Sequence, residues 1–383
     1  MRTVLYCIIF RQTMNFLDTL KQINRFGKHG GSVVGIDIGS SAIKIVELEE
    51  RHGKPTLSKY GTLAVGPYAK THVGTPVKLS PIKLEEAIRT AFKAIGIQAK
   101  RGALAIPLKL SLIVTIDFPL SVADKLDQVV PIEARKYIPL PLNEVNIAWT
   151  IASAPESKSM NAPKETKEEE KIKILVAAIQ NTTILDYQNI ATNLGLQPVT
   201  LEIETFSAMR SISRPQKEIY ALLDVGAEDS KIVVHNHGSI TSSHTINKGS
   251  YAITQALSSS LGVSFKEAEH IKRKYGLIGE YNGKNLQDII RPELEYIFSE
   301  ARRVIDSFKE QFNKTIESVV LIGGGSTLQG ISPFATELCG KTIVLGDAFG
   351  TVELPTPALR DVLKESGPEY AVALGLAMRI LKE

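Results

Sequence analysis

The stretch Val33-Val-Gly-Ile-Asp-Ile-Gly-Ser-Ser-Ala-Ile-Lys-Ile-Val46 decides how the rest of the chain is interpreted. Its apolar residues predict two strands, 33–38 and 42–46, joined by a tight turn at 39–41. A turn of small residues lets backbone N–H groups approach an anion closely. Asp37, just before the turn, could hold through water the Mg²⁺ ion that accompanies a phosphate. On its own this pattern also fits an ordinary surface hairpin, so a second copy is needed to decide.

A second copy lies about half the chain further on. The stretch Leu222-Leu-Asp-Val-Gly-Ala-Glu-Asp-Ser-Lys-Ile-Val-Val234 repeats the order of strand, acid, apolar residue, glycine, polar turn and strand. A third apolar strand, 317–322, runs into Gly323-Gly-Gly-Ser326, which we expect to open a helix. Two hairpins from opposite lobes can clamp phosphates and their metal, and a glycine strip can lie along the α-phosphate and the base. The three turns predict a duplicated α/β fold with a nucleotide between its lobes.

Length and composition support more than one core. The chain has 383 residues, of which 43% are hydrophobic and 22% charged, which is typical of a globular protein with two or more lobes. Its two cysteines, Cys7 and Cys339, exclude a disulfide framework and a cysteine-based zinc site. The net charge of +4 comes from residues 1–29, because acidic and basic side chains balance in the remainder. The body therefore lacks the charge of a nucleic-acid-binding protein.

The segment 1–29 is expected to stand apart from this body. Its apolar run, 4–10, is too short to span a bilayer, which needs about 20 residues, and it lacks a signal-peptide cleavage site. Met14 is an alternative start. Residues 14–28 alternate apolar and basic side chains at helical spacing, which predicts an amphipathic helix against an anionic membrane or a partner. A leader without fixed structure fits the same residues.

The pattern between the two hairpins changes near Pro107, and 108–200 is predicted to be an α+β unit inserted into the first lobe. In this unit we expect a helix over 121–137, with a capping box at its start and a kink or division at Pro131. The polar stretch 155–171 is expected to be a loop. The other strands expected here are 111–118, 146–152 and 172–179, with a helix at 183–194. Outside the unit, helices are expected at 80–96, 249–261, 265–275, 291–312, 328–338 and 368–381.

The three turns resemble those of the actin/Hsp70/sugar-kinase ATPase superfamily over residues 31–382. The inserted unit resembles that of FtsA and of its relatives in the PilM family, actin-like proteins of type IV pilus assembly. The stretch Glu133-Ala-Arg-Lys-Tyr-Ile-Pro-Leu-Pro-Leu-Asn-Glu-Val145 is similar to the Glu-Ala-x-x-Tyr-Ile-Pro motif of that family. The opening Gly35-Ile-Asp-Ile-Gly-Ser-Ser-Ala-Ile-Lys44 is similar too. The resemblance implies a duplicated actin-like (ribonuclease H-like) two-lobe fold with an FtsA-type insert.

This resemblance also divides the chain. The implied parts are a leader (1–29), first-lobe subdomain 1A (30–107, with 201–216 and 352–383), inserted subdomain 1C (108–200), second-lobe subdomain 2A (217–276, with 313–351) and subdomain 2B (277–312).

The resemblance implies ATP and Mg²⁺ as ligands. Asp37 and Asp224 match the two acids on the metal side. Glu269 and Lys272 match a Glu-x-x-Lys motif that reaches the ribose and adenine in bacterial actins, although a surface ion pair would explain them as well. In the second phosphate loop Ala-Glu-Asp-Ser replaces the usual Gly-Gly or Gly-Thr, which leaves phosphate contact by its side chains open. The residues implied for the phosphate loops are Gly39, Ser40, Ser41, Ala42 and Lys44, then Gly226, Ala227 and Glu228, then Gly323, Gly324, Gly325 and Ser326.

The implied partner is the short cytoplasmic tail of an inner-membrane pilus protein, PilN, docked between the first lobe and the insert. That partner places the chain in the cytoplasm at the inner face of the membrane. Contact with the membrane would be indirect or through residues 14–28, self-association stays open, and no nucleic acid is expected. The resemblance alone points to this partner.

The sequence offers no convincing catalytic base. Such a base would open the helix after 172–179, at about Thr183, and the nearby Asp186 fits a capping box better. We therefore expect slow or absent ATP turnover, with the nucleotide setting the angle between the lobes. A small-molecule kinase and an FtsA-like division protein are the alternatives. The missing base argues against the first, and the end of the chain at Glu383, without a linker and anchoring helix, argues against the second.

Overall fold

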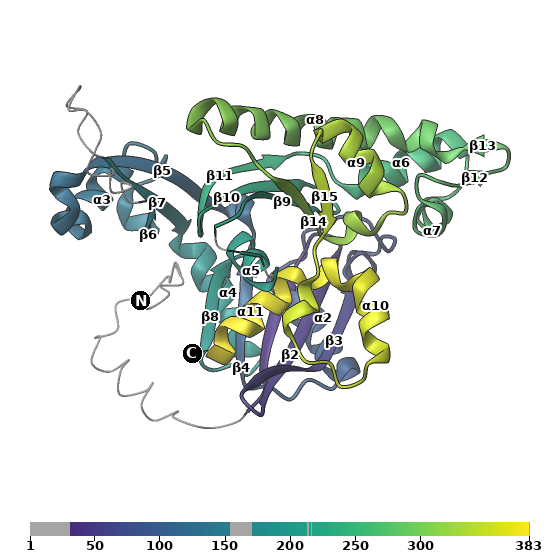
Figure 1. The fold of residues 1–383 in the computed structure, drawn as a ribbon. Helices are drawn as coiled ribbons and strands as arrows, with labels where there is room; N and C mark the ends of the chain where they lie inside the picture. Colours follow the sequence, from purple (N-terminus) through teal and green to yellow (C-terminus); the bar gives the residue numbers. More distant parts are fainter. Residues whose placement is uncertain (1–30, 154–170, 213, 216, 383) are drawn as a thin grey trace.

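The computed structural model describes residues 31–153, 171–212, 214–215 and 217–382, which form two lobes and an insert (Figure 1). The predicted leader 1–29, the helix after Met14 and all but the end of the loop 155–171 lie outside the described residues. Among the helices of the described part, none is long and apolar enough to cross a membrane.

The first lobe is built on the predicted hairpin. β1 and β2 pair antiparallel around the turn, with Asp37 opposite Lys44. On its other edge β1 pairs parallel with β4, and β4 pairs parallel with β8. The sheet order is β3-β2-β1-β4-β8. Its strands are β1 (Val33–Ile38), β2 (Ala42–Arg51), β3 (Lys54–Ala64), β4 (Arg101–Ile106) and β8 (Val199–Ile203).

The second lobe repeats this sheet strand for strand, in the order β11-β10-β9-β14-β15. Its central strand β9 again pairs antiparallel with its hairpin partner and parallel with the strand on its other edge. The predicted duplicated two-lobe α/β fold is therefore confirmed. The strands are β9 (Ile219–Val225), β10 (Ser230–Asn236), β11 (Ser239–Ile246), β14 (Ser318–Ile322) and β15 (Thr342–Leu345).

Helices cover both sheets, and one of them is almost entirely apolar. α11 is buried along nearly its whole length between the first sheet and α5, as expected for a helix without a polar face. The first lobe carries α2 (Pro81–Ile95), α4 (Asn181–Asn193), α5 (Glu204–Ser211), α10 (Ala358–Ser366) and α11 (Ala371–Lys382). The second carries α6 (Ser250–Leu261), α7 (Phe265–Tyr275), α8 (Leu286–Phe312) and α9 (Ile331–Cys339), with a small hairpin of β12 (Glu280–Tyr281) and β13 (Lys284–Asn285).

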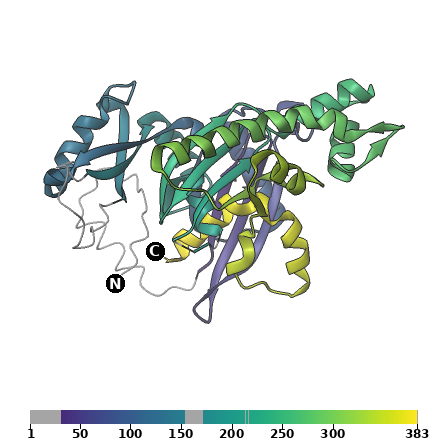
Figure 2. The same cartoon turned by 45° about the horizontal axis from the view of Figure 1, so that its top comes forward.

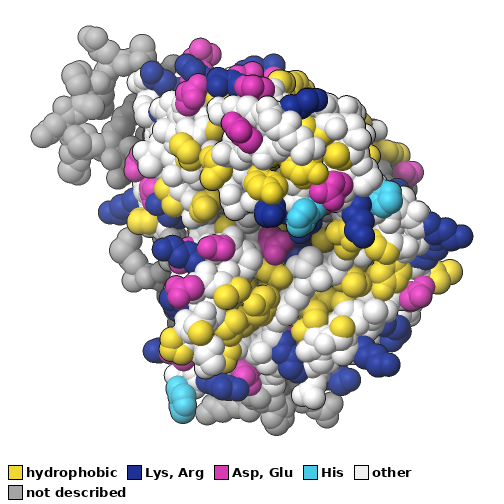
Figure 3. Space-filling view, turned by 90° about the vertical axis from the view of Figure 1, so that its right-hand side faces the viewer, with side chains coloured by type: hydrophobic (Ala, Val, Ile, Leu, Met, Phe, Trp, Pro, Cys, Tyr) yellow, Lys and Arg dark blue, Asp and Glu magenta, His cyan; other side chains and the backbone are white. Residues whose placement is uncertain are grey.

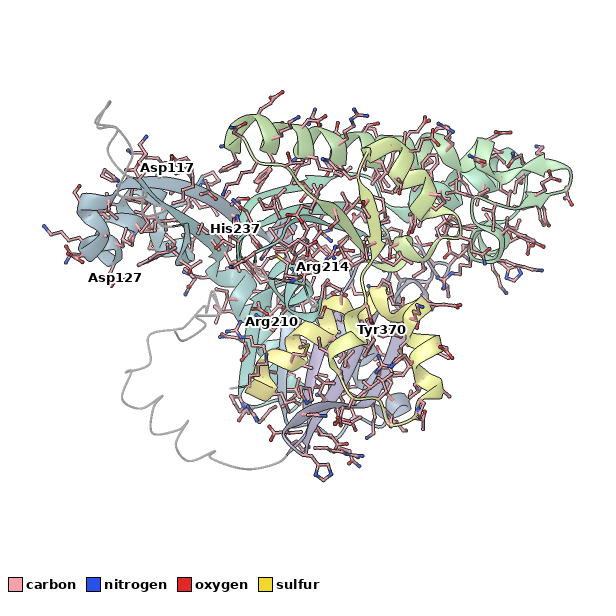
Figure 4. The ribbon with its side chains drawn as sticks, in the orientation of Figure 1. Asp117, Asp127, Arg210, Arg214, His237 and Tyr370 are labelled. Carbon is pink, nitrogen blue, oxygen red and sulfur yellow. The ribbon has the colours of Figure 1, made fainter. Side chains whose placement is uncertain are left out.

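The insert projects from one side of the molecule (Figures 1 and 2) and has a hydrophobic core of its own. It is a three-stranded antiparallel sheet in the order β5-β7-β6, covered by α3. Its elements are β5 (Ser111–Pro119), α3 (Leu126–Ala134), β6 (Val145–Ser153) and β7 (Lys171–Gln180). The carboxylates of Asp117 and Asp127 lie on this unit, far from Tyr370 beside α11 (Figure 4).

Several predicted details of the insert are wrong. A 3-10 turn occupies 120–125, and α3 then begins at Leu126 and continues through Pro131 without division. Pro131 is the sixth residue of α3 and has no N–H to donate to the Asp127 carbonyl, yet the helix continues past it. The predicted end of the insert at 200 is also too late. Ile184, Ile190 and Ala191 of α4 join the core of the first lobe, and β8 joins its sheet, so the insert ends near 180.

Three corrections concern other helices. α4 begins at Asn181, without the capping box predicted at Thr183. α8 begins at Leu286 and not at 291, because the side chain of Asn285 accepts a hydrogen bond from the Gln287 N–H and caps the helix earlier. The glycine strip opens a 3-10 turn, 324–327, and α9 follows only at Ile331. The apolar side chains of α8 share the core of the second lobe, so the predicted subdomain 277–312 has no separate core.

Candidate functional site

A cavity of about 730 Å³ lies between the two lobes, a size typical of sites for small ligands. Figure 3 shows a hollow across this side of the molecule, with acidic and basic side chains in and beside it. All the predicted site residues except Glu228 line the cavity. They are Asp37, Gly39, Ser40, Ser41, Ala42, Lys44, Asp224, Gly226, Ala227, Glu269, Lys272, Gly323, Gly324, Gly325 and Ser326. The fold thus brings together three turns that are far apart in the sequence.

The two hairpin turns close in the same way. The Gly39 N–H donates to the Ala42 carbonyl at 3.1 Å, and the Gly226 N–H donates to the Asp229 carbonyl at 3.1 Å. A Cβ atom at Gly226 would lie 2.6 Å from the Asp229 carbonyl oxygen, so a side chain does not fit there. Both lobes therefore present a turn with exposed backbone to the cavity, which is what a close approach of phosphate oxygens requires.

The glycine strip supplies a third surface without side chains. Gly323 has a φ of 83°, and a Cβ atom there would lie 2.1 Å from Oδ1 of Asp224. A Cβ atom at Gly324 would meet nothing within 4 Å, so this residue faces open space. The buried hydroxyl of Ser326 donates to the Gly323 carbonyl at 2.7 Å and closes the turn. The strip leaves room for a flat ring or a phosphate against its backbone.

The cavity floor carries acids from both lobes with lysines between them. Lys44 Nζ lies 3.3 Å from Oδ2 of Asp37. Burial alone would lower the pKa of Lys44, but the carboxylates of Asp37 and Asp224 outweigh it and raise the pKa. Burial raises the pKa of Asp224, against the opposing charges of Lys231 and Lys44. Carboxylate oxygens are preferred ligands of Mg²⁺, and two of them leave coordination positions for water and phosphate oxygens. The donor set therefore fits a phosphate-bound Mg²⁺.

Glu204 also lines the cavity, and the sequence reasoning missed it. It is buried at the first position of α5, accepts a hydrogen bond from the Leu108 N–H at 2.6 Å and lies 3.3 Å from Lys231 Nζ. Burial raises the pKa of Glu204 and the negative charges of Asp224 and Asp37 add to this, while Lys231 opposes it. A buried carboxyl with a raised pKa is suited to accept a proton.

The structure therefore supplies a carboxyl that the search for a base in the sequence did not consider. The predicted position of the base follows 172–179, but β7 belongs to the sheet of the insert. The strand of the first-lobe sheet that leads into the cleft is β8, and Glu204 follows it directly. The available signal was a carboxyl at the end of an apolar strand, the same signal that identified Asp37 and Asp224.

At the other end of the cavity, Glu269 and Lys272 form a buried ion pair at 2.7 Å, so the surface-pair explanation is wrong. The Thr254 hydroxyl and Arg273 Nε each donate to the Glu269 carboxylate at 2.7 Å. Burial would raise the pKa of Glu269, but Lys272 and the other donors outweigh it and lower the pKa. Gly74 of the first lobe lies against the same carboxylate.

A side pocket of about 240 Å³ opens beside this pair. It is lined by Ser250, Ile253, Lys272, Arg273, Gly324, Gly325, Thr327 and Leu328, which combine apolar groups, bare backbone and charged donors. This combination suits a flat base with a polar sugar.

Glu228 is the one predicted site residue outside the cavity. Its half-exposed carboxylate pairs with Lys109 Nζ at 2.6 Å, at the start of the insert. Glu369 in turn lines the cavity without having been predicted. Burial raises the pKa of Glu369, against the charges of Lys44 and Arg273. Its position depends on a turn between α10 and α11 for which the sequence has no phosphate-loop pattern.

Sequence comparisons relate the chain to two groups of known proteins. A family model described as "Type IV pilus assembly protein PilM" matches residues 35–381. The cell division protein FtsA of Streptococcus pneumoniae is 19% identical over 346 residues, which cover 82% of this chain and 75% of that protein. FtsA of Staphylococcus epidermidis is 21% identical over 243 residues, which cover 57% of this chain and 49% of the relative.

Structural comparisons agree with the sequence comparisons. A chain of a "PilM-PilN type IV pilus biogenesis complex" is 25% identical, with a TM-score of 0.74 over 92% of this chain and 99% of that one. MreB5 of Spiroplasma citri bound to AMPPNP is 12% identical, with a TM-score of 0.51 over 93% of this chain and 97% of that one. EutJ of Carboxydothermus hydrogenoformans is 15% identical, with a TM-score of 0.51 over 95% and 99%. The last two similarities show the actin-like fold.

Proposed function

The chain belongs to the type IV pilus assembly protein PilM family, whose model matches residues 35–381, and from that premise we propose that it binds ATP with Mg²⁺ as a switch in pilus assembly. The observation that carries this proposal is the cavity between two hairpin turns closed by the same hydrogen bond. Similar proteins of this fold support it, since one of them is described as bound to AMPPNP.

Each residue group has a proposed role in that complex. The turns at 39–42 and 226–227 would hold the phosphates through backbone N–H groups, together with Lys44. Asp37 and Asp224 would hold Mg²⁺, directly or through water. The strip 323–326 and the pair Glu269 and Lys272 would hold the nucleoside. ATP with Mg²⁺, when bound, supplies the charges that draw the two lobes together.

Glu204 changes the proposal for turnover. Its carboxyl lines the cavity, and its raised pKa makes it a stronger base than an exposed glutamate. The expected slow or absent turnover depends on the lack of such a group. We therefore assign to Glu204 the uptake of a proton from water during ATP hydrolysis, with Lys231 and the Leu108 N–H orienting its carboxylate.

The partner is a PilN-like inner-membrane protein, and the similarity to the PilM-PilN complex supports this. Its cytoplasmic tail would dock between the first lobe and the insert, which keeps the chain in the cytoplasm at the inner face of the membrane. Leu110, where the chain enters the insert, and Leu185, on α4 where the chain leaves it, are exposed at 41% and 45% of their surface. Exposed apolar side chains are typical anchors for a bound peptide. Self-association and membrane contact through residues 14–28 stay predictions.

The FtsA-like alternative is not favoured, because the family model is that of PilM and the FtsA relatives are distant. A thermal-shift screen separates the proposed function from a kinase of the same fold. Stabilisation by ATP with Mg²⁺ and by a PilN-like tail peptide is expected. Stabilisation by a sugar or by acetate, without an effect of the peptide, would instead identify a small-molecule kinase.

A further inference from the structure

The segment 107–110 leads from β4 of the first lobe into β5 of the insert, and we call it the junction segment. It contacts acids of both lobes. The Leu108 N–H donates to Oε1 of Glu204 at 2.6 Å. Lys109 Nζ lies 2.6 Å from Oε2 of Glu228 and 3.6 Å from Oδ2 of Asp229, both in the turn of the second hairpin. The start of the insert is therefore tied to α5 and to the opposite lobe at once.

These contacts close into a ring that borders the cavity. Asp229 lines the cavity and accepts from Lys231 Nζ at 2.9 Å. Lys231 Nζ also lies 3.3 Å from Glu204, which accepts from the Leu108 N–H. Lys109 completes the ring to Asp229. Any ligand that adds charge between the hairpins acts on Lys231 and Asp229. Through these two side chains it also acts on Leu108 and Lys109 of the junction segment.

The second connection of the insert, from β7 into α4, also leads into the first lobe. α4 follows β7 directly, and its Tyr187 packs against the core of the first lobe. Burial raises the pKa of Tyr187, and the charges of Glu204 and Asp37 add to this. Side chains on one face of the insert's sheet form its own core, whereas Leu175, Ala177 and Ile179 of β7 pack into the core of the first lobe, so a shift of the two connections also reaches the insert through these packed side chains.

We propose that Lys109 and the junction segment couple occupancy of the cleft to the position of the insert. This inference rests on the proposed function and names the contacts through which nucleotide binding would reach the insert. A nucleotide that draws the second hairpin toward the first lobe would carry Glu228 and Asp229 with it, and the insert would follow through Lys109. Because coupling is reciprocal, a peptide bound to the insert changes the affinity for nucleotide by the same factor.

The chain carries a native reporter of this movement. Trp149 is its only tryptophan and lies half-buried on β6 of the insert, in a sheet that contacts β11 of the second lobe. The experiment titrates the full chain with AMPPNP and Mg²⁺ and follows the Trp149 emission spectrum. The parent is expected to show a saturable change in emission.

The variant Lys109→Met removes the charge and keeps most of the stem. It is expected to bind AMPPNP within about fivefold of the parent, since exposed ion pairs contribute little, while the Trp149 response falls to less than half. Lys136→Met is the matched control, because Lys136 also pairs with a carboxylate at 2.7 Å but follows α3, the helix that Figure 1 shows at the outer end of the insert. Its response should equal that of the parent. The exchange Lys109→Glu with Glu228→Lys should recover much of the response.

Three outcomes overturn the proposal. One is a full Trp149 response in Lys109→Met, and another is a parent that binds nucleotide with unchanged emission. The third is an equal loss of response in Lys136→Met, which would show a general effect of charge removal on the insert. A parent that binds no nucleotide, by calorimetry, contradicts the proposed function itself and the coupling with it. Circular dichroism confirms that each variant is folded.

Discussion

Two glutamates on β8 and α5 show how position decides the chemistry of a carboxyl. Glu202 is enclosed with Arg210 and Arg379, at 2.6 and 3.0 Å, away from the cavity. Burial would raise the pKa of Glu202, but these arginines outweigh it and lower the pKa. Two residues on, Glu204 faces the cavity with one lysine and one N–H group, and its pKa is raised. Glu202 is thus a fixed anion that holds helices, whereas Glu204 can take up a proton.

The substitution Glu204→Gln should separate binding from turnover. It keeps the shape of the side chain and removes the base, so ATP hydrolysis is expected to fall by about 100-fold, with ATP affinity little changed. Phosphate release under single-turnover conditions and calorimetry measure the two. Hydrolysis at the parental rate would exclude Glu204 as the base.

We expect the stability of the second lobe to depend on pH through His235. Its Nδ1–H donates to the Glu218 carbonyl at 3.0 Å, and its Nε2 accepts from the Gly238 N–H at 3.1 Å, an arrangement that requires the neutral ring. Burial lowers the pKa of His235, helped by His237 and opposed by the Glu218 carbonyl. Because the unfolded chain has the higher pKa, about 6.5, it binds the proton first as the pH falls.

The contribution of His235 to the free energy of unfolding should therefore be fully present above pH 6.5 and should decrease as the pH falls below that value. Urea denaturation at pH 8 and at pH 5.5 measures this loss. The variant His235→Gln is expected to be less stable at pH 8 but to lose less between the two pH values. Parallel losses in parent and variant would show that His235 does not titrate on unfolding.

At the scale of elements, the crossing of α5 and α11 positions Glu204. A Cβ atom at Gly375 of α11 would lie 1.8 Å from the Ser207 carbonyl oxygen of α5, so the two helices touch through backbone. Arg210 of α5, labelled in Figure 4, also donates to the Gly375 carbonyl at 3.1 Å. α5 begins at Glu204, so a shift of this crossing displaces the carboxyl in the cleft.

The substitution Gly375→Ala tests that crossing. In an unconstrained helix the change would stabilise by about 1 kcal/mol. Here the methyl group must push α5 away, and we expect a loss of about 1–3 kcal/mol in the free energy of unfolding. Chemical denaturation measures it, and a stabilised variant would contradict the close contact.

The sequence correctly predicted those strands, turns and helix caps that depend only on residues close together in the chain. The strand, acid and glycine order located both hairpins, and Ser264 caps α7 as expected, by accepting from the Glu267 N–H. What the sequence could not predict depends on tertiary partners. The strands β7 and β8 have similar apolar character, and only their pairing shows that one belongs to the insert and the other leads to Glu204. Similarly, Glu228 lies outside the cavity and pairs with Lys109, which is 119 positions away in the sequence. A pairing over that distance could not be predicted from local patterns.

At the scale of the whole molecule, the insert has a core of its own, packs Leu175, Ala177 and Ile179 of β7 into the core of the first lobe, and contacts the second lobe. Lys173 of the insert lies 5.4 Å above the ring of Phe312 at the end of α8. A peptide bound between the first lobe and the insert and a nucleotide bound between the two lobes would therefore act on the same set of contacts. This arrangement is what the proposed switch requires.

Leu185→Asp tests the docking surface at that scale. It places a charge at the border of first lobe and insert, and the affinity for a PilN-like tail peptide should fall by about tenfold or more. Ile278→Asp is the control, because Ile278 is 74% exposed on the second lobe and should leave peptide binding unchanged. Fluorescence polarisation with a labelled peptide measures both. Equal affinities of Leu185→Asp and the parent would place the peptide elsewhere.

The central claim is that the turn after Asp37 is one half of a clamp for ATP with Mg²⁺. Calorimetric titration of the parent and of Asp37→Ala with ATP and Mg²⁺ tests it most directly. The parent should bind, and Asp37→Ala should show no measurable binding while keeping the circular dichroism spectrum of the parent. A folded Asp37→Ala variant that binds as tightly as the parent would contradict the account.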